Sequence, residues 1–312
     1  QARLGQVRVP ATLTGIRQAR LDGLPESERA VLQAASDLGR SFWDGALAAL
    51  AGFDPDAVSA VFDGLEAREL VYPRQNSTFS GQREYVFKHA LLRQAVYESV
   101  SKRQRRRYHL TAAEWLVAQS RERAPEYAAL VAGHFEAAED WNRAALWYGQ
   151  AGKQAYEAYE SGAAVMYYQK ALQFTRQANI PAAERLDWQE FLGKSLFALA
   201  RYEDALNAYQ EMRAIADTAA SVDGWARAWY NIAYVHDHIG NNTLSLESAE
   251  NALRLADKGA EPELLIRAVY GKGWALYRLG DANSAIHLGE LALRLARNLE
   301  NQIGRASCRE RV

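Results

Sequence analysis

The sequence predicts a mainly α-helical chain that ends in an array of stacked helical repeats. The first observation is a repeat, because the pentapeptide Ala252–Ala256 recurs unchanged at Ala292–Ala296, an offset of 40 residues. The second is that apolar residues recur at helical spacing almost everywhere from Leu24 to Leu299. A fixed period in this range is typical of arrays in which each unit buries its apolar face against its neighbours. Such arrays usually bind partners rather than catalyse reactions.

The composition allows a packed core and argues against several classes of protein. Of the 312 residues, 49% are hydrophobic, and 37 Lys and Arg nearly balance 38 Asp and Glu. This balance gives no reason to expect nucleic acid or an anionic membrane as the main partner. No run approaches the roughly 18 apolar residues of a membrane-spanning helix, and no signal peptide is visible. With Cys308 as the only cysteine, we expect a cytoplasmic protein.

The prolines mark where the helices begin. Pro25, Pro55, Pro125, Pro181 and Pro262 fall just before or at the start of a periodic segment, where a missing N–H costs nothing. The periodicity then predicts helices at 25–39, 43–52, 55–69, 89–101, 103–121, 126–138, 141–158, 161–178, 182–199, 202–216, 222–239, 242–257, 263–279 and 282–299.

One stretch after the third helix breaks this pattern. Leu70–Arg74 and Glu84–Phe87 are short β-prone runs, and the polar loop Gln75–Gln82 between them is typical of a hairpin. Three helices followed by two strands are the winged-helix arrangement. We expect a winged-helix domain at 24–88, connecting helices at 89–124 and repeats of about 40 residues at 125–300.

The repeats carry small residues where two paired helices would pack closely. In the last two units they are Ala233, Gly240, Ser245 and Ala252, then Gly273, Gly280, Ala285 and Ala292. The unit before them has Gly193, Ala200, Ala205 and Met212 at these positions, a weaker fit because methionine is not small. A small residue in the first helix, glycine at the turn and small residues in the second helix resemble the tetratricopeptide repeat. That resemblance implies an α-solenoid superhelix, with longer helices than in the usual repeat of about 34 residues.

No constellation of residues points to catalysis. The chain has no phosphate-binding loop, no dinucleotide-binding glycine motif, no His-Glu-x-x-His and no cysteine pair for zinc. His236 and His238 are two apart on a helix, so they cannot hold one ion together. A structural role is favoured for all six histidines. We expect no enzyme activity, no catalytic residues, no metal and no cofactor in this chain.

A winged helix can bind DNA, in which case helix 55–69 would enter the major groove. Phosphates would repel this helix, because acidic residues dominate it. They are Asp54, Asp56, Asp63, Glu66 and Glu69, against the single Arg68. A structural winged helix packed between other modules is therefore the favoured interpretation.

The basic cluster consists of Lys102, Arg103, Arg105, Arg106 and Arg107. It could contact nucleic acid, anionic lipid or an acidic partner. We favour a solvated helix start, because apolar residues follow and give the helix a buried face. Neither nucleic acid nor a membrane is thus an expected partner.

Aromatic side chains and arginines concentrate on the first helices of the last two units. In a tetratricopeptide array these helices line a concave groove, and Tyr, Trp and Arg are enriched at binding hot spots. The residues mapped to that face are Arg227, Tyr230, Tyr234, Asp237, His238, Arg267, Tyr270, Trp274, Tyr277 and Arg278. We predict a protein or peptide partner in this groove. The alternative is that several of these side chains fill the core between helices.

Several segments resemble one group of signalling proteins. The most specific is Tyr85–Glu98 (YVFKHALLRQAVYE), followed by Arg106–His109 and Ala113. Val9–Leu13 and Gln18–Pro25 resemble the end of an ATPase lid, and Ala34–Phe42 resembles the first turn into the winged helix. Together they resemble bacterial signal-transduction ATPases of the AAA/STAND type, most closely those with a class III adenylate/guanylate cyclase domain.

The resemblance implies a regulatory role. ATP and Mg²⁺ would bind an upstream ATPase module in cis, and the repeats would couple that module to a partner. The chain itself has neither phosphate loop nor cyclase domain, so we expect a non-enzymatic sensor or scaffold segment. The alternative is a DNA-binding transcriptional regulator that uses the winged helix.

Both ends of the chain indicate a fragment. It starts at Gln1 rather than Met, and the family resemblance implies that 1–23 is the remnant of an ATPase lid. The tail 301–312 continues no repeat and is predicted to be non-native or disordered.

Overall fold

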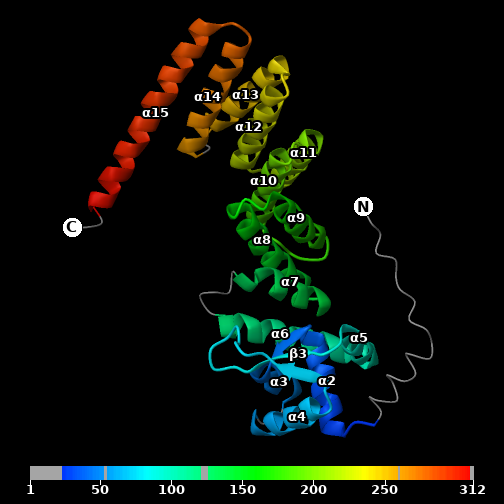
Figure 1. Cartoon of the computed structure of the whole chain (residues 1–312). Coiled ribbons are helices and arrows are strands. Elements are labelled where there is room, and N and C mark those ends of the chain that lie inside the picture. Colours follow the sequence, from blue (N-terminus) through cyan, green and yellow to red (C-terminus); the bar gives the residue numbers. More distant parts are fainter. Residues whose placement is uncertain (1–22, 53–54, 121–125, 259–260, 310–312) are drawn as a thin grey trace. The chain divides into compact units, whose positions relative to one another are not determined.

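The computed structural model describes residues 23–52, 55–120, 126–258 and 261–309 of a mainly helical chain (Figure 1). The chain divides into two compact units, 1–147 and 148–312. Helix α8 (Trp141–Glu157) spans the boundary between them. The predicted lid remnant, apart from Gly23, lies outside the described residues.

The first unit combines helices with a small antiparallel sheet. Its elements are α2 (Glu26–Leu38), β1 (Ser41–Trp43), α3 (Asp44–Ala51), α4 (Pro55–Ala67), β2 (Val71–Pro73), β3 (Glu84–Phe87), α5 (Ala90–Ser99), α6 (Lys102–Ser120) and α7 (Ala128–Ala137). The strand order is β1-β3-β2. The two β-prone runs form β2 and β3, which pair with each other. Strand β1 was not predicted, because three residues are too few to show alternation.

A cluster of aromatic rings joins the sheet to the helices of the first unit. Phe62 of α4 stacks on Tyr85 of β3 with ring centroids 3.9 Å apart. Phe42 of β1 lies 5.1 Å from Phe87 of β3, centroid to centroid. All four side chains are buried. Because large rings dominate core energetics, this cluster explains why β1 pairs with β3 despite its length.

Buried Glu84 organises the loop between β2 and β3. Its Oε2 accepts hydrogen bonds from the Thr78 amide at 2.9 Å and the Thr78 hydroxyl at 2.6 Å. Its Oε1 accepts from Nη1 of Arg74 at 2.7 Å. Burial raises the pKa of Glu84, but these hydrogen bonds outweigh it and lower the pKa below its ordinary value. One ionised carboxylate therefore ties the middle of the polar loop to Arg74, the residue that precedes it.

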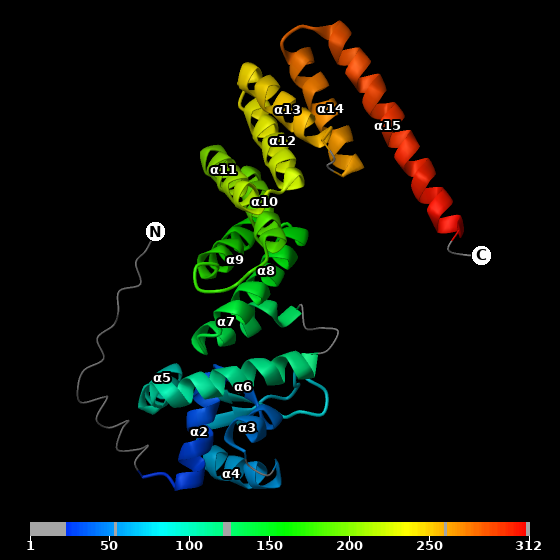
Figure 2. The same cartoon turned by 180° about the vertical axis from the view of Figure 1, so that it is seen from behind.

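The second unit is a stack of helices that continues from α8 (Figure 2). Its further helices are α9 (Ser161–Phe174), α10 (Ala182–Ala198), α11 (Tyr202–Ala219), α12 (Val222–His238), α13 (Asn242–Ala256), α14 (Pro262–Arg278) and α15 (Ala282–Arg309). From α9 onward each helix packs on the next, and α12 also contacts both α10 and α14. Helices α10, α12 and α14, which begin the three repeat units, thus form one row.

Helix α15 runs past the helix end that the periodicity predicted at Leu299 and continues to Arg309. That the tail 301–312 is non-native or disordered stays a prediction. No proline or glycine stands between Leu299 and Ile303, so no stop signal ends the helix there.

The turn inside each helix pair has the same backbone conformation. The residue two positions before the second helix has a positive φ, which is 58° at Ala200, 83° at Gly240 and 92° at Gly280. This left-handed region favours glycine, because a Cβ crowds the following carbonyl. Two of the three repeats therefore have the residue that the turn prefers.

Candidate functional site

The predicted groove residues lie on α12 and α14, neighbouring helices of the row in the second unit. Apart from the adjacent pairs Asp237–His238 and Tyr277–Arg278, spacings of three and four residues place those of each helix on one face. The structure distributes them among two cavities, an ion network and a ring cluster, and leaves two arginines half-exposed. Each group has different chemistry.

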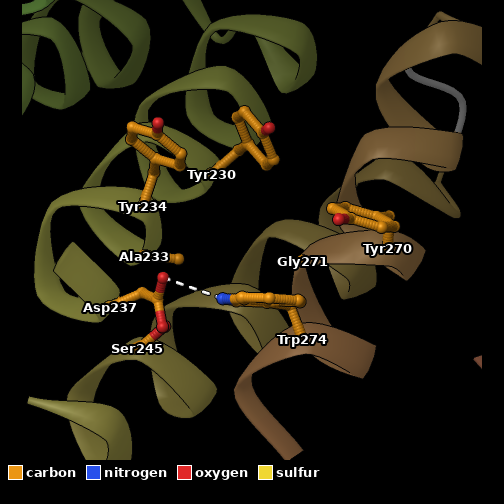
Figure 3. A pocket seen from close by; sticks show the side chains of 8 residues that line it. All are labelled: Tyr230, Ala233, Tyr234, Asp237, Ser245, Tyr270, Gly271 and Trp274. Atoms are coloured by element: carbon orange, nitrogen blue, oxygen red, sulfur yellow. Dashed lines mark hydrogen bonds between the residues drawn. The ribbon is translucent and has the colours of Figure 1, made fainter. Parts of the chain in front are cut away.

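Five of them line one cavity between α12 and α14, named here the α12–α14 cavity (Figure 3). Its volume is about 280 Å³, and its remaining lining residues are Ala233, Ser245 and Gly271. The five predicted residues in its wall are Tyr230, Tyr234, Asp237, Tyr270 and Trp274. Tyr234, Tyr270 and Trp274 are 53%, 56% and 43% exposed. Three large rings are thus half open to solvent around one hollow.

Asp237 fixes the ring of Trp274. Nε1 of Trp274 donates a hydrogen bond to Oδ2 of Asp237 at 2.9 Å (Figure 3). Oδ1 of Asp237 lies 3.5 Å from Nε of Arg278, and this oxygen is buried and accepts no hydrogen bond. The Trp274 ring lies 6.5 Å from Tyr270 and 5.6 Å from Tyr277, centroid to centroid. Trp274 is therefore held in place from α12 and flanked by two tyrosines of its own helix.

Tyr277 faces a second cavity, between α14 and α15. This hollow of about 260 Å³ is also lined by Tyr270, Trp274 and the 60% exposed Ile286. None of its lining residues is charged. The two cavities share Tyr270 and Trp274 but differ in charge, because only the α12–α14 cavity contains a carboxylate.

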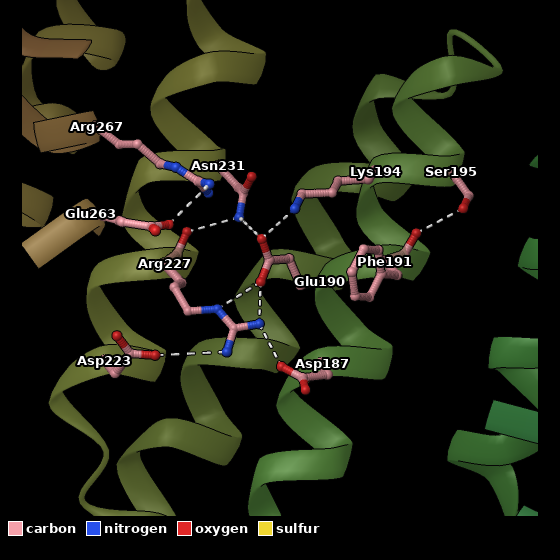
Figure 4. A network of polar contacts seen from close by, with 10 residues as sticks. All are labelled: Asp187, Glu190, Phe191, Lys194, Ser195, Asp223, Arg227, Asn231, Glu263 and Arg267. Atoms are coloured by element: carbon pink, nitrogen blue, oxygen red, sulfur yellow. Dashed lines mark hydrogen bonds and ion pairs between the residues drawn. The ribbon is translucent and has the colours of Figure 1, made fainter. Parts of the chain in front are cut away.

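Arg227 belongs to an ion network rather than to either cavity (Figure 4). Its Nε donates to Oε2 of Glu190 at 2.6 Å, and its Nη2 donates to Oδ1 of Asp187 at 2.6 Å. Nζ of Lys194 lies 2.6 Å from Oε1 of Glu190. Burial raises the pKa of Glu190, but Lys194 and Arg227 outweigh it, so the pKa lies below its ordinary value. The network joins α10 to α12, and the guanidinium of Arg227 is already paired with carboxylates of this chain.

His238 packs among rings, and the last two predicted arginines are half-exposed. The imidazole of His238 lies 4.9 Å from the Phe197 ring, and its Nε2 is 3.1 Å from the Tyr202 hydroxyl. The side chains of Arg267 and Arg278 are 54% and 44% exposed. These two arginines remain accessible beside the aromatic residues.

Sequence reasoning missed Glu190, although a signal for it exists. The Glu190–Arg227 and Asp237–Trp274 pairs both join residues 37 apart in the sequence. The repeat period is 40 residues, so a separation of 37 is about one helical turn shorter than the period. Two residues at this separation therefore lie on neighbouring helices of the row. A search for complementary side chains at this spacing would have found both pairs.

Part of the basic cluster on α6 is neutralised within the first unit. Nε of Arg105 donates to the Val100 carbonyl at 3.1 Å, and its guanidinium lies 4.7 Å from the centre of the Tyr97 ring. Arg106 forms an ion pair with Glu139. Lys102, Arg103 and Arg107 are exposed. This arrangement agrees with a solvated helix start.

A buried polar cluster in the first unit was not predicted as a group. Nε2 of His109 lies 3.3 Å from Oδ1 of Asp37, and its Nδ1 lies 2.9 Å from Nδ1 of His134. Burial raises the pKa of Asp37 to about 7. Burial lowers the pKa of His109 to about 4 and that of His134 to about 3. Both imidazoles are therefore neutral at pH 7, in an environment that disfavours charge.

On the part of the chain that the structure describes, no three His, Cys, Asp or Glu side chains gather as metal ligands. None of the helices in the same ranges is both long and apolar enough to cross a bilayer.

Comparison with a family model identifies a repeat in the second unit. The model of the tetratricopeptide repeat matches residues 226–258, which cover most of α12 and all of α13. No curated protein matches the sequence. The α12–α13 pair, which carries half of the predicted groove residues, thus matches the family model.

Solved structures are similar to the chain in fold. The apo form of RapI matches with a TM-score of 0.52 at 14% identity, over 65% of this chain and 74% of that one. Aspartyl phosphate phosphatase F from Bacillus subtilis matches with a TM-score of 0.51 at 14% identity, over 93% of this chain and 70% of that one. At such identities the likeness shows the fold alone, a mainly helical chain with tetratricopeptide-like repeats.

A further solved structure matches most of the chain with a lower score. A signal transduction ATPase with numerous domains (STAND) and a tetratricopeptide repeat sensor, from Pyrococcus horikoshii, covers 92% of this chain and 47% of that one. Its TM-score is 0.37 at 13% identity.

Proposed function

We propose that the row of α10, α12 and α14 binds a protein or peptide partner, with the α12–α14 cavity at the centre of the contact. The observation that carries the proposal is the exposure of Tyr234, Tyr270 and Trp274, which are 53%, 56% and 43% accessible around one hollow. Tetratricopeptide-like repeats are typical protein-interaction scaffolds. Tyr and Trp dominate binding hot spots, because they bury a large area at a low cost in conformational entropy.

The rigidity of this surface also supports the proposal. Arg227 and Glu190 tie α12 to α10, and Trp274 and Asp237 tie α14 to α12. A surface held by such cross-repeat bonds changes little when a partner binds. Less conformational entropy is then lost on binding, which favours affinity.

We further propose that the chain is the non-enzymatic regulatory segment of a cytoplasmic signalling ATPase. Its domains would be a winged helix at 24–88, connecting helices at 89–124 and the repeats at 125–300. The element order α2-β1-α3-α4-β2-β3 and the Tyr85–Glu98 block support this assignment. ATP and Mg²⁺ would bind the ATPase module, and the repeats would report partner binding to it.

No observation on the described residues favours the DNA-binding alternative. Helix α4 buries Val58, Phe62 and Leu65 in the first unit, and its Asp63 and Glu66 would repel phosphates. Arg68, just after α4, is paired with Glu28 at 3.0 Å. A protein partner therefore remains the better conclusion.

Selection of random displayed peptides on the whole chain tests the proposal. Recovered peptides would be titrated against the wild-type chain and against a Tyr234→Ala/Tyr270→Ala variant. Loss of two hot-spot rings should weaken binding at least about tenfold. The control Tyr72→Ala, an exposed ring in the first unit, should leave the Kd unchanged. Peptides that bind the double variant as tightly as the wild type would refute the proposed surface.

A further inference from the structure

The α12–α14 cavity combines aromatic faces with a buried carboxylate oxygen that accepts no hydrogen bond. We infer that Tyr230, Tyr234, Tyr270, Trp274 and Asp237 form a cage for the charged head of an arginine or lysine side chain. The inference rests on the proposed function, because it names what the partner inserts at the cavity. It adds the chemical class of the inserted side chain and a role for the residues of α12 and of α14 that line the cavity.

The rings supply faces on both sides of the hollow. Tyr230 and Tyr234 extend from α12, whereas Tyr270 and Trp274 extend from α14 (Figure 3). Among the described residues, no ring contact joins the two α12 tyrosines to Tyr270 or Trp274 across the space. A cation is attracted to a ring face within about 6 Å of its centre, most strongly to that of Trp. The separated walls thus leave room for a guest that touches both.

Asp237 gives the cavity the complementary charge. Its Oδ2 already accepts the indole N–H of Trp274, which polarises the ring and makes its face more attractive to a cation. Its Oδ1 is buried and accepts no hydrogen bond. Buried polar atoms normally have a partner, and a guanidinium or ammonium group brings N–H donors together with a positive charge.

A neutral guest fits this cavity less well. An apolar side chain would leave Oδ1 of Asp237 buried without a donor. Aromatic grooves also recognise proline-rich peptides. In such grooves the indole N–H is free to donate a hydrogen bond to the peptide. The N–H of Trp274 already donates to Asp237. The neighbouring cavity beside α15 has no charged lining and suits an apolar side chain instead.

Arg278 is the internal competitor of the guest. Its Nε lies 3.5 Å from Oδ1 of Asp237, in a contact that is an ion pair without a hydrogen bond. Its side chain is 44% exposed, so it can turn into solvent when a guest arrives. Removal of the Arg278 charge should therefore strengthen binding, whereas removal of the Asp237 charge should weaken it.

Fluorine NMR of the full chain labelled with 5-fluorotryptophan tests the cage. The probes are acetyl-arginine methylamide and its neutral counterpart acetyl-citrulline methylamide. The Trp274 resonance is assigned by its loss in Trp274→Phe. We expect the arginine probe to shift this resonance in a saturable way, with a Kd at least fivefold lower than that of the citrulline probe.

Substitutions at Asp237 and Arg278 should change the affinity for the arginine probe in opposite directions. Asp237→Asn keeps an acceptor for the Trp274 N–H and should weaken the arginine probe at least fivefold. Arg278→Gln should strengthen it about twofold to threefold, and Tyr270→Leu should weaken it, while Tyr72→Leu in the first unit should change nothing. The cage is refuted if citrulline binds as tightly as arginine, if Asp237→Asn has no effect, or if neither probe shifts the resonance up to its solubility limit.

Failure of the cage and failure of the proposed function are distinguishable. Selected peptides that require Tyr270 but contain no basic residue would preserve the partner-binding surface and overturn the cage. Basic peptides whose binding requires both Tyr270 and Asp237 support the cage and the proposed function. Peptides that ignore Tyr234 and Tyr270 overturn the proposed function, and the arginine titration then still decides whether the cavity binds a cation.

Discussion

The ring of Tyr209 in α11 occupies the space that Gly193 in α10 leaves open. A Cβ added to Gly193 would lie 2.4 Å from Cε1 of Tyr209, a side chain that is 2% exposed. One period further on, the equivalent residues are Ala233 and Ala249, with no ring between them. The small residue that the repeat pattern predicts in the first helix is thus required at Gly193 by one specific neighbour.

Gly193→Ala should therefore lower the free energy of unfolding of the second unit by about 1–3 kcal/mol, since Tyr209 is buried and has to move. The intrinsic helix preference of Ala over Gly, about 1 kcal/mol, opposes this loss. Chemical denaturation followed by circular dichroism measures the net change.

The control for that substitution is Gly289→Ala in α15, where nothing lies within 4 Å of an added Cβ. This change should stabilise the chain by up to about 1 kcal/mol through helix preference alone. If both variants were stabilised equally, Tyr209 would not need the space beside Gly193.

The positions of the repeat helices were predictable because independent signals coincide there. Helices α10, α12, α13 and α14 begin and end within one residue of the ranges that periodicity, prolines and turn glycines predicted. Each of these signals acts within one or two turns of helix, so the sequence of a single segment contains it. In contrast, β1 depends on its pairing with the distant β3, and its own three residues gave no sign of a strand.

The side-chain partners in the candidate site were less predictable. Arg227 and Tyr230 lie on the same face of α12, and both are of residue types that are enriched at binding surfaces. Nevertheless, Arg227 is bonded to Glu190, whereas Tyr230 lines the cavity. The difference arises from which residues of the neighbouring helix meet each position. Helical periodicity alone does not contain that offset.

Ala200 occupies the turn position that is glycine in the next two repeats. Its φ of 58° costs an L-residue about 1–2 kcal/mol. Ala200→Gly should therefore raise the free energy of unfolding by about 1 kcal/mol, less the entropy that glycine adds to the unfolded chain. The reverse change at the equivalent position, Gly240→Ala, should destabilise by a similar amount. A loss of stability in Ala200→Gly under thermal or urea denaturation would contradict this account of the turn.

The ion network around Glu190 should contribute more stability than an exposed pair. Glu190→Gln removes the negative charge that pairs with both Arg227 and Lys194. The carboxylate oxygens of Glu190 lie 2.6 Å from Nε of Arg227 and 2.6 Å from Nζ of Lys194. We expect a loss of about 1–3 kcal/mol, below the range for a fully buried pair because both cations are partly exposed. Denaturant titration at low and high salt measures the loss.

Glu263→Gln is the matched control for this network. Glu263 lies 3.9 Å from Arg267, and both side chains are more than half exposed. The change should stay within about 0.5 kcal/mol, as for surface pairs in general. Equal effects of the two substitutions would mean that burial of Glu190 adds nothing to the interaction.

The buried Asp37–His109–His134 cluster should make the stability of the first unit depend on pH. It is faced by Arg93 and Tyr97 of α5 and by Arg105 of α6. The pKa of Asp37 is raised from 3.8 to about 7, so its contribution to stability is present below about pH 4 and is lost as pH rises toward 7. The pKa values of both imidazoles are lowered from 6.5, so their contribution is lost as pH falls below 6.5.

Asp37→Asn separates these opposing effects, because it removes the carboxyl titration and leaves both histidines in place. The difference in free energy of unfolding, variant minus wild type, should rise between about pH 4 and pH 7 and then level off. A rise of about 4 kcal/mol at most is expected, because each pKa unit between 3.8 and about 7 corresponds to about 1.4 kcal/mol. Asp281→Asn, at a carboxyl whose pKa is lowered by hydrogen bonds from Ser284, should give a constant difference from pH 5 to 8. A flat profile for Asp37→Asn as well would mean that Asp37 keeps its charge throughout, and that the arginines of α5 and α6 stabilise the ionised carboxylate more than burial disfavours it.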